Sequence, residues 1–285
     1  MVEESGAAQP GGGCANAVLA ALPEGGTVVR LRQSEGWVLA VVRAADGVLA
    51  AGMAGVPHAV RGQCCLPGGA MQPDGKVADH YPAEQDADAT TWARMLTFPL
   101  AGEAAVGLAV TNALLATSPE PAAVRDGVDW LLSVAAGRAV AVVGGFPFVD
   151  RSLRSVAGKV WVLERDPAEG ELHADEAAEI LPQADFVVIT GSALANHTLD
   201  GLLDWIRPET RTMLLGPSTA LCSRLFAFGF EALSGVRVRD VDVVAAAIAQ
   251  GVPFRRMPGL ERVTLFATNV PERETRASSS GGGGL

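Results

Sequence analysis

The feature that most constrains the fold is a regular alternation of strand-like and helix-like segments from residue 122 onward. Short apolar runs bounded by glycine, of which 139–143 is the clearest, have the composition of strands buried on both faces. Parallel neighbours need crossover helices, so this alternation predicts a parallel, doubly wound sheet with helices on both faces. The expected strands are 139–143, 159–163, 185–189, 211–215, 231–234 and 262–267, and the expected helices are 122–135, 148–157, 174–181, 193–206, 219–228 and 240–250.

The stretch 139–165 is typical of the first βαβ unit of a Rossmann-like half. A glycine pair, Gly144 and Gly145, follows the first strand, and Glu164 ends the second strand twenty residues after Gly144. Dinucleotide folds place a carboxylate at about that spacing to accept hydrogen bonds from a ribose diol. The sequence GGFPF is not the GxGxxG fingerprint, because Phe146 and Phe148 crowd the position of a pyrophosphate. A plain strand–helix corner is the alternative interpretation.

Ligands of open parallel sheets bind beyond the carboxyl ends of the strands, where this sequence gathers its unusual residues. Helix N-termini after Gly145, Gly191 and Ser218 would favour a carboxylate or phosphate, whereas turn formation and helix capping explain the same residues without a ligand. Arg165 either contacts the ligand or pairs with Asp166 or Glu169. The candidate ligand-binding residues are Gly144, Gly145, Phe146, Pro147, Phe148, Glu164, Arg165, Thr190, Gly191, Ser192, Asn196, Thr198, Gly216, Pro217 and Ser218.

The first part of the chain has a different pattern, that of a small α+β domain. A helix is expected at 14–22, strands at 27–32, 37–43 and 47–53, a Gly/Pro-rich loop at 55–84, and helices at 87–96 and 103–117. Asn112 is a polar residue in the last, apolar helix. It either hydrogen-bonds within the core or faces a ligand cleft, and it is therefore the remaining candidate ligand-binding residue. The long loop is a candidate lid.

Prolines at 119–121 mark the expected boundary between the two domains. We therefore divide the chain into a disordered segment 1–13, an α+β domain 14–118, a Rossmann-like domain 119–271 and a disordered tail 272–285.

The composition restricts the possible partners and the compartment. A net charge of −10 without a basic cluster argues against nucleic-acid binding, and the apolar runs are too short to span a membrane. The acidic N-terminal residues do not match a secretory signal, and the four cysteines contain no CxxC pair. We expect a cytoplasmic protein with reduced thiols.

Several motifs, taken in order, resemble those of the DUF364 family, a putative heavy-metal chelation domain, which usually follows a DUF4213 domain with an enolase N-terminal-like fold. The motifs are VGLAVTNALLA (106–116), VVGGFPF (142–148), VLERDP (162–167), ADFVVITGSALANHTLDGLL (184–203), LLGPSTAL (214–221) and FGFEALSGVRVRDVDVVAAAIAQG (228–251). The resemblance implies an enolase N-terminal-like domain packed on a Rossmann-like domain, with a cleft between them.

Three functions remain open at this point. The first is a small-molecule binding protein, or an enzyme of unknown reaction, whose cleft holds a nucleotide-like or anionic ligand. The second is heavy-metal chelation or delivery. Here His197 and a set of His58, Cys64 and Cys65 are the possible ligands, although adjacent cysteines lack paired spacing, and Cys222 is expected in the core. The third is a non-catalytic scaffold. Separately, if the first domain does not take part in ligand binding, its simplest purpose is dimerisation, which would give a homodimer. The chain carries no Walker, HExxH, Ser-His-Asp or paired-carboxylate signature that would name a reaction.

Overall fold

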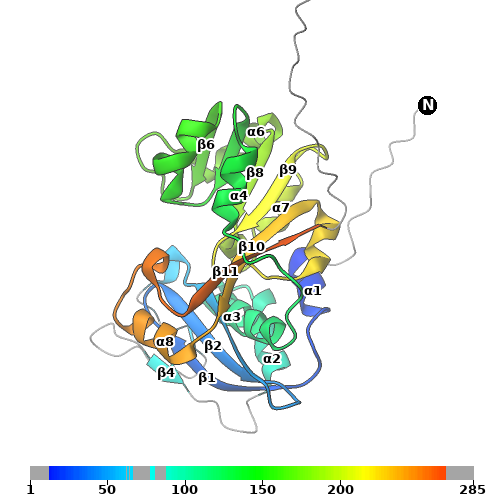
Figure 1. Cartoon of the computed structure of the whole chain (residues 1–285), viewed down its shortest axis with the longest axis vertical. Helices are drawn as coiled ribbons and strands as arrows, with labels where there is room; N and C mark the ends of the chain where they lie inside the picture. The colour runs from blue at the N-terminus through cyan, green and yellow to red at the C-terminus, as the bar shows by residue number, and fades with distance from the viewer. Residues whose placement is uncertain (1–12, 62, 64, 67–77, 81–87, 268–285) are drawn as a thin grey trace, which may run out of the picture.

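The strands form two sheets, which lie one above the other in Figure 1. The computed structural model describes residues 13–61, 63, 65–66, 78–80 and 88–267. The upper sheet is seven-stranded, with the order β11-β10-β9-β8-β5-β6-β7, and the lower sheet has the order β3-β2-β1-β4. The disorder expected at 1–12 and 272–285 lies outside the described residues, whereas Gly13 is not part of a disordered segment but the first residue of α1 (Gly13–Leu19).

The lower sheet is an antiparallel meander, as the sequence predicts. It contains β1 (Thr27–Gln33), β2 (Trp37–Arg43), β3 (Leu49–Gly55) and β4 (Ala78–His80). The two predicted hairpin turns are present, with Ser34 and Trp37 closing the first. Much of the expected 55–84 loop lies outside the described residues, and the described part contains a 3₁₀-helix (His58–Val60) as well as β4.

Helices cover both faces of the lower sheet. The long apolar helix α3 (Ala101–Thr117) packs on one face with Val38, Ala40 and Val42 of β2, together with α2 (Ala89–Ala93) and the 3₁₀-helix Arg94–Thr97. The alternate residues of β2, Leu39 and Val41, pack against α8 (Val241–Ala249). Since side chains alternate across a strand, α8 covers the opposite face. A helix late in the sequence therefore completes the first sheet.

The upper sheet is parallel except at one edge. Its strands are β5 (Ala139–Val143), β6 (Lys159–Glu164), β7 (Leu172–His173), β8 (Phe186–Thr190), β9 (Arg211–Leu215), β10 (Phe230–Val238) and β11 (Leu260–Phe266). The predicted parallel pairing of β5 with β6 is confirmed, and β11 is antiparallel to β10. The six parallel strands have the Rossmann order, which reverses between β5 and β8. The short edge strand β7 was not predicted.

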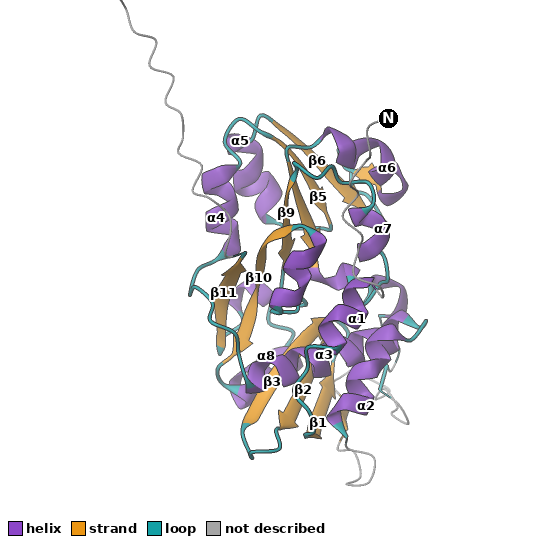
Figure 2. Ribbon diagram, turned by 90° about the vertical axis from the view of Figure 1, so that its right-hand side faces the viewer, coloured by secondary structure: helices purple, strands orange, loops and turns teal. Residues whose placement is uncertain are grey.

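Figure 2 shows α4 and α5 on one side of this sheet and α6 and α7 on the other, which confirms the mixed α/β prediction. The helices are shorter than expected. They are α4 (Gly127–Val134), a π-helix (Val149–Leu153) leading into α5 (Arg154–Val156), α6 (Ala177–Ile180), α7 (Leu199–Leu203) and 3₁₀-helices at Ala174–Glu176, Leu181–Gln183, Gly191–Ala193, Ser223–Phe228 and Phe254–Arg256.

Two predicted helices are wrong for identifiable reasons. The segment predicted as a helix at 193–206 is interrupted by His197, whose φ of 57° is left-handed and incompatible with a right-handed helix. The helix predicted at 219–228 begins only at Ser223. Thr219, the first residue of the predicted helix, packs closely against Gly191 and Gly235. A Cβ at Gly191 would lie 2.4 Å from Thr219 N, and a Cβ at Gly235 would lie 3.2 Å from Thr219 O.

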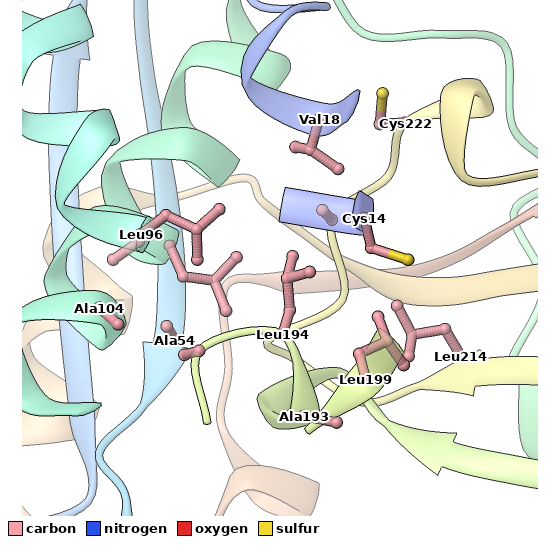
Figure 3. Packing of buried hydrophobic residues seen from close by; sticks show 14 of the residues in the cluster. Cys14, Val18, Ala54, Leu96, Ala104, Ala193, Leu194, Leu199, Leu214 and Cys222 are labelled. Atoms are coloured by element: carbon pink, nitrogen blue, oxygen red, sulfur yellow. The ribbon is translucent and has the colours of Figure 1, made fainter. Parts of the chain in front are cut away.

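The largest hydrophobic cluster runs through both sheets. It joins Leu31 and Leu108 of the lower layer to Leu214 and Leu233 of the upper sheet. Figure 3 shows Cys14 and Val18 of α1 beside Leu194 and Leu199 at this junction, with Cys222 nearby. Cys222 is fully buried, as expected of a core residue. None of the described helices has both the length and the apolar character needed to cross a membrane.

Candidate functional site

The loops after β5 and β8 meet where the strand order reverses. Gly144 follows β5 with φ 112°, a conformation that favours glycine, and a Cβ at this position would lie 2.9 Å from the Cβ of Thr190. In an open α/β sheet this reversal point is where ligands bind. The structure therefore brings the predicted residues of these two loops together at one edge.

The ring of Phe146 lies between the glycine turns that follow β5 and β9. Its ring is 3.4 Å from the Cβ position of Gly144 and 3.7 Å from that of Gly216, which follows β9. The ring of Phe148 lies 5.5 Å from that of Phe146, measured between centroids. The aromatic pair therefore occupies the space beside the glycine turn, where a dinucleotide fold leaves room for a pyrophosphate.

Glu164 lies beside the glycine turn. One carboxylate oxygen, Oε1, is 2.7 Å from the position that a Cβ would take at Gly145, and Oε2 accepts a hydrogen bond of 3.1 Å from the backbone N–H of Arg165. A side chain larger than glycine at position 145 would displace the carboxylate. Neither of the expected ion pairs of Arg165, to Asp166 or to Glu169, forms in the described part of the chain.

Two serines connect the upper sheet to the lower one. Ser218, which is 2% exposed, accepts hydrogen bonds from the backbone N–H of Gly55 at 2.9 Å and from the hydroxyl of Ser192 at 3.1 Å. Gly55 is the last residue of β3, and the sequence carries no signal for its place here. The two serines of the predicted site therefore lie at the junction of the two sheets.

The segment 196–198 lies in a turn before α7 rather than within a helix. His197 donates from Nε2 to the backbone carbonyl of Phe98 at 2.7 Å, because a carbonyl oxygen only accepts hydrogen bonds. The side-chain oxygen of Asn196 is buried and has no partner among the described residues. Thr198 is the N-cap residue of α7 without a side-chain capping bond.

Asn112 occupies a separate place. Its Nδ2 donates to the backbone carbonyl of Met53 at 3.0 Å, while the residue also lines a cavity of about 20 Å³. The first alternative, a hydrogen bond within the core, is confirmed for Nδ2, whereas contact with a ligand stays a prediction. That cavity is lined by Asn112, Leu115, Ala116, Pro119, Glu120, Thr219, Leu221, Val236 and Arg237, and not by the Phe146 and Glu164 edge.

A larger hollow of about 530 Å³ lies between α1 and α2. Its lining is mixed, with Leu19, Leu22 and Pro23 beside the polar residues Asn16, Thr90 and Arg94. No sequence motif predicts this hollow, because it forms between elements that are about 70 residues apart.

The expected helix N-termini do not form as predicted. Gly145 is followed by a five-residue π-helix, and Gly191 begins a three-residue 3₁₀-helix. Ser218 is followed by the non-helical segment 219–222. Because a macrodipole needs several aligned peptide units, these loops supply little of the positive potential that the sequence suggested for an anion.

The described residues contain no group of three or more His, Cys, Asp or Glu side chains placed to hold a metal ion. Burial, with Asp200 nearby, raises the pKa of the Cys14 thiol above its ordinary value, and burial also raises the pKa of Cys222. Since the thiolate is the metal-binding form, neither thiol is prepared as a ligand. The set of His58, Cys64 and Cys65 cannot be judged as a unit, because Cys64 lies outside the described residues.

The part of the chain that forms the upper sheet is similar in sequence to a known protein family. Residues 126–266 match the DUF364 family. The description of that family model is "Putative heavy-metal chelation". The uncharacterized protein MJ0500 of Methanocaldococcus jannaschii is 30% identical over 123 residues, which are 41% of this chain and 48% of that protein. The match therefore spans about half the length of this curated relative.

Two solved structures of DUF364 proteins, both described as having unknown function, share the fold. The protein from Desulfitobacterium hafniense has a TM-score of 0.71 and 23% identity, with 89% of this chain and 96% of that chain covered. The protein from Pyrococcus horikoshii has a TM-score of 0.64 and 18% identity, with coverage of 88% and 97%. The fold extends over both sheets in these DUF364 structures, while the DUF4213 and enolase-like resemblance of residues 14–118 stays a prediction.

Proposed function

We propose that this protein binds a small, nucleotide-like molecule through a vicinal diol at the carboxyl ends of β5, β6 and β8. The observation that carries the proposal is the position of Glu164. Its carboxylate lies against Gly145 at the end of the second strand of a Rossmann-ordered sheet. Dinucleotide folds use an acidic residue in that place to accept hydrogen bonds from ribose hydroxyls.

The hydrogen-bonding capacity of Glu164 supports a diol. An ionised carboxylate offers about four acceptor positions. The backbone N–H of Arg165 uses one of them on Oε2, so Oε1 is free to accept a hydrogen bond from a hydroxyl group. On the loop that follows β8, Asn196 adds a buried amide oxygen that has no hydrogen-bond partner among the described residues.

The surroundings of the glycine turn favour a nucleoside-like ligand over a dinucleotide. The rings of Phe146 and Phe148 occupy the space for a pyrophosphate, and a five-residue π-helix replaces the long helix whose N-terminus would bind it. Aromatic faces instead stack with flat heterocycles. Residues 14–118, which resemble an enolase N-terminal-like domain, would close the site from the side of Gly55.

The test is native mass spectrometry of the purified protein, followed by titration with adenosine, AMP and NAD⁺. We expect a co-purified organic mass, and tighter binding of adenosine or AMP than of NAD⁺. Glu164→Gln should reduce binding at least tenfold, because one hydrogen bond to a charged group contributes about 1.5–3 kcal/mol. Glu169→Gln, an exposed acid on the following loop, is the matched control and should bind like the unmodified protein. If no organic mass co-purifies and no diol binds, the proposal is wrong.

Heavy-metal chelation is a second candidate, favoured by the description of the DUF364 model and by His197. Metal-binding histidines usually donate their other ring N–H to a carbonyl or carboxylate, as His197 does to Phe98. Elemental analysis should then find stoichiometric metal that His197→Ala removes. Retention of metal in Cys64→Ser/Cys65→Ser would separate this site from the cysteine pair. The described residues supply no further ligand cluster, so the organic ligand is the better-supported proposal.

The remaining expectations concern assembly and location. We infer a cytoplasmic protein that does not bind nucleic acid, on the basis of its composition and charge, and we propose a homodimer as one use of the first domain. Light scattering on the purified protein at two concentrations tests the dimer, and fractionation of cells tests the location.

A further inference from the structure

Two residues that line one small cavity at the junction of the sheets each carry a buried polar atom without a described partner. The hydroxyl oxygen of Thr219 and the amide oxygen of Asn112 have no hydrogen-bond partner among the described residues. Thr219 is 3% exposed. Both residues line the cavity of about 20 Å³ beside α3. A buried polar atom without a partner costs about 1–3 kcal/mol, so native proteins rarely leave two of them in one place.

Neither residue is free to turn toward the other. Asn112 Nδ2 donates to Met53 O, which fixes the amide and identifies Oδ1 as the acceptor that lacks a donor. The backbone of Thr219 is fixed by the hydrogen bond from its N–H to the carbonyl of Gly216 at 3.0 Å and by its close packing against Gly191. The described residues contain no hydrogen bond between these two side chains, so a third group is what would pair both oxygens.

We propose that one internal water molecule occupies this cavity, donates a hydrogen bond to Asn112 Oδ1 and bonds to Thr219 Oγ1. A cavity needs roughly 10–15 Å³ to hold a water, and the water needs two to four polar partners. A cavity of about 20 Å³ is large enough for one water. Of the two charged residues in the lining, Arg237 donates from Nη2 to the backbone carbonyl of Glu120, and the Glu120 carboxylate accepts from the backbone N–H of Ser223.

The water would link α3 of the lower layer to the loop that follows β9. That loop also carries Ser218, whose hydroxyl holds the end of β3 through Gly55. The junction would then have two polar connections, one direct and one through water. This water site is separate from the proposed ligand site, because Glu164 and Phe146 do not line the cavity.

A crystal structure of the full chain that resolves ordered solvent tests the proposal directly. We expect one ordered water within hydrogen-bond distance of both Asn112 Oδ1 and Thr219 Oγ1, whether or not a ligand is bound. A dry cavity, or a direct hydrogen bond between the two side chains, would overturn it.

Matched threonine variants give a second measurement. Thr219→Val keeps the shape and removes the hydroxyl, and it should lower the melting temperature by about 2–4 °C. Thr219→Ser keeps the hydroxyl and should keep the water in its crystal structure even if stability falls. Thr111→Val is the control, because the Thr111 hydroxyl is also buried without a described partner on α3 but does not line the cavity. Its melting temperature should be unchanged or higher. Equal responses of the two valine variants would contradict the water bridge.

Discussion

The backbone N–H of Gly55, the last residue of β3, donates to the buried hydroxyl of Ser218 at 2.9 Å, so the lower sheet ends on the loop that leaves β9. The same hydroxyl accepts a hydrogen bond from the hydroxyl of Ser192, which lies on the loop after β8. One side chain thus connects three segments that are far apart in the sequence, and it lies between the two halves of the molecule.

Ser218→Ala should lower the free energy of unfolding by about 1–3 kcal/mol, because the Gly55 N–H and the Ser192 hydroxyl would lose their shared acceptor in a buried place. Urea denaturation measures this. Ser192→Ala removes one bond from a more exposed residue and should cost less. An equal or larger loss for Ser192→Ala would mean that the Gly55 bond contributes little.

Gly144→Ala should destabilise the protein by about 1–3 kcal/mol, since alanine is strained at φ 112° and its Cβ would meet Thr190 at 2.9 Å. Gly170→Ala is the matched control, because Gly170 also has a positive φ, 84°, but no atom within 4 Å of its Cβ position. The difference between the two variants in thermal denaturation measures the contact at the strand-order reversal. If the two lose the same stability, the close approach to Thr190 is relieved by a small shift.

Asp88 caps α2, and its contribution should depend on pH. Its carboxylate accepts hydrogen bonds from the Thr91 N–H at 2.7 Å and the Thr90 hydroxyl at 2.8 Å, and these bonds lower the pKa of Asp88. The stabilisation is therefore present above the unfolded pKa of about 4 and is lost as the pH falls through the lower, folded value. Asp88→Ala should cost about 1 kcal/mol at pH 7 and progressively less below pH 4. A cost that is independent of pH would contradict this role.

The buried thiol of Cys14 should make the protein less stable in alkali. Burial and the neighbouring Asp200 raise the pKa of this thiol in the folded state. The unfolded chain then ionises first, so the contribution is complete below about pH 8.5 and is lost as the pH rises. Cys14→Ala should show a smaller fall in stability between pH 8 and 10 than the unmodified protein. Val18→Ala, a truncation in the same cluster without a titrating group, should keep the full fall.

The strands could be predicted because apolar runs bounded by glycine are local signals, and 139–143 was located to the residue as β5. The helices were predicted less well, because their lengths depend on contacts between loops. The apolar run after β8 has the composition of a helix, yet the bond from His197 to Phe98 accompanies a left-handed residue that ends it. No property of the local sequence reports that contact.

The site was predicted by position and not by geometry. Strand ends placed Gly144, Glu164 and Thr190 on one edge of the sheet correctly, since the carboxyl ends of parallel strands share an edge. The sequence predicts only that Thr219 begins a helix, whereas in the structure it borders the cavity beside Asn112. Its role arises from the close packing of Gly191, which is a tertiary contact.

The position of α8 has a consequence for how the chain is made. The outer face of the lower sheet, formed by Leu39, Val41 and Met53, is covered by a helix about 200 residues later. Synthesis at about 5–20 residues per second delivers that helix roughly 10–40 seconds after β2. During this interval the nascent sheet has an uncovered apolar face. The ribosome-bound chain therefore presents a surface that general chaperones recognise until α8 emerges.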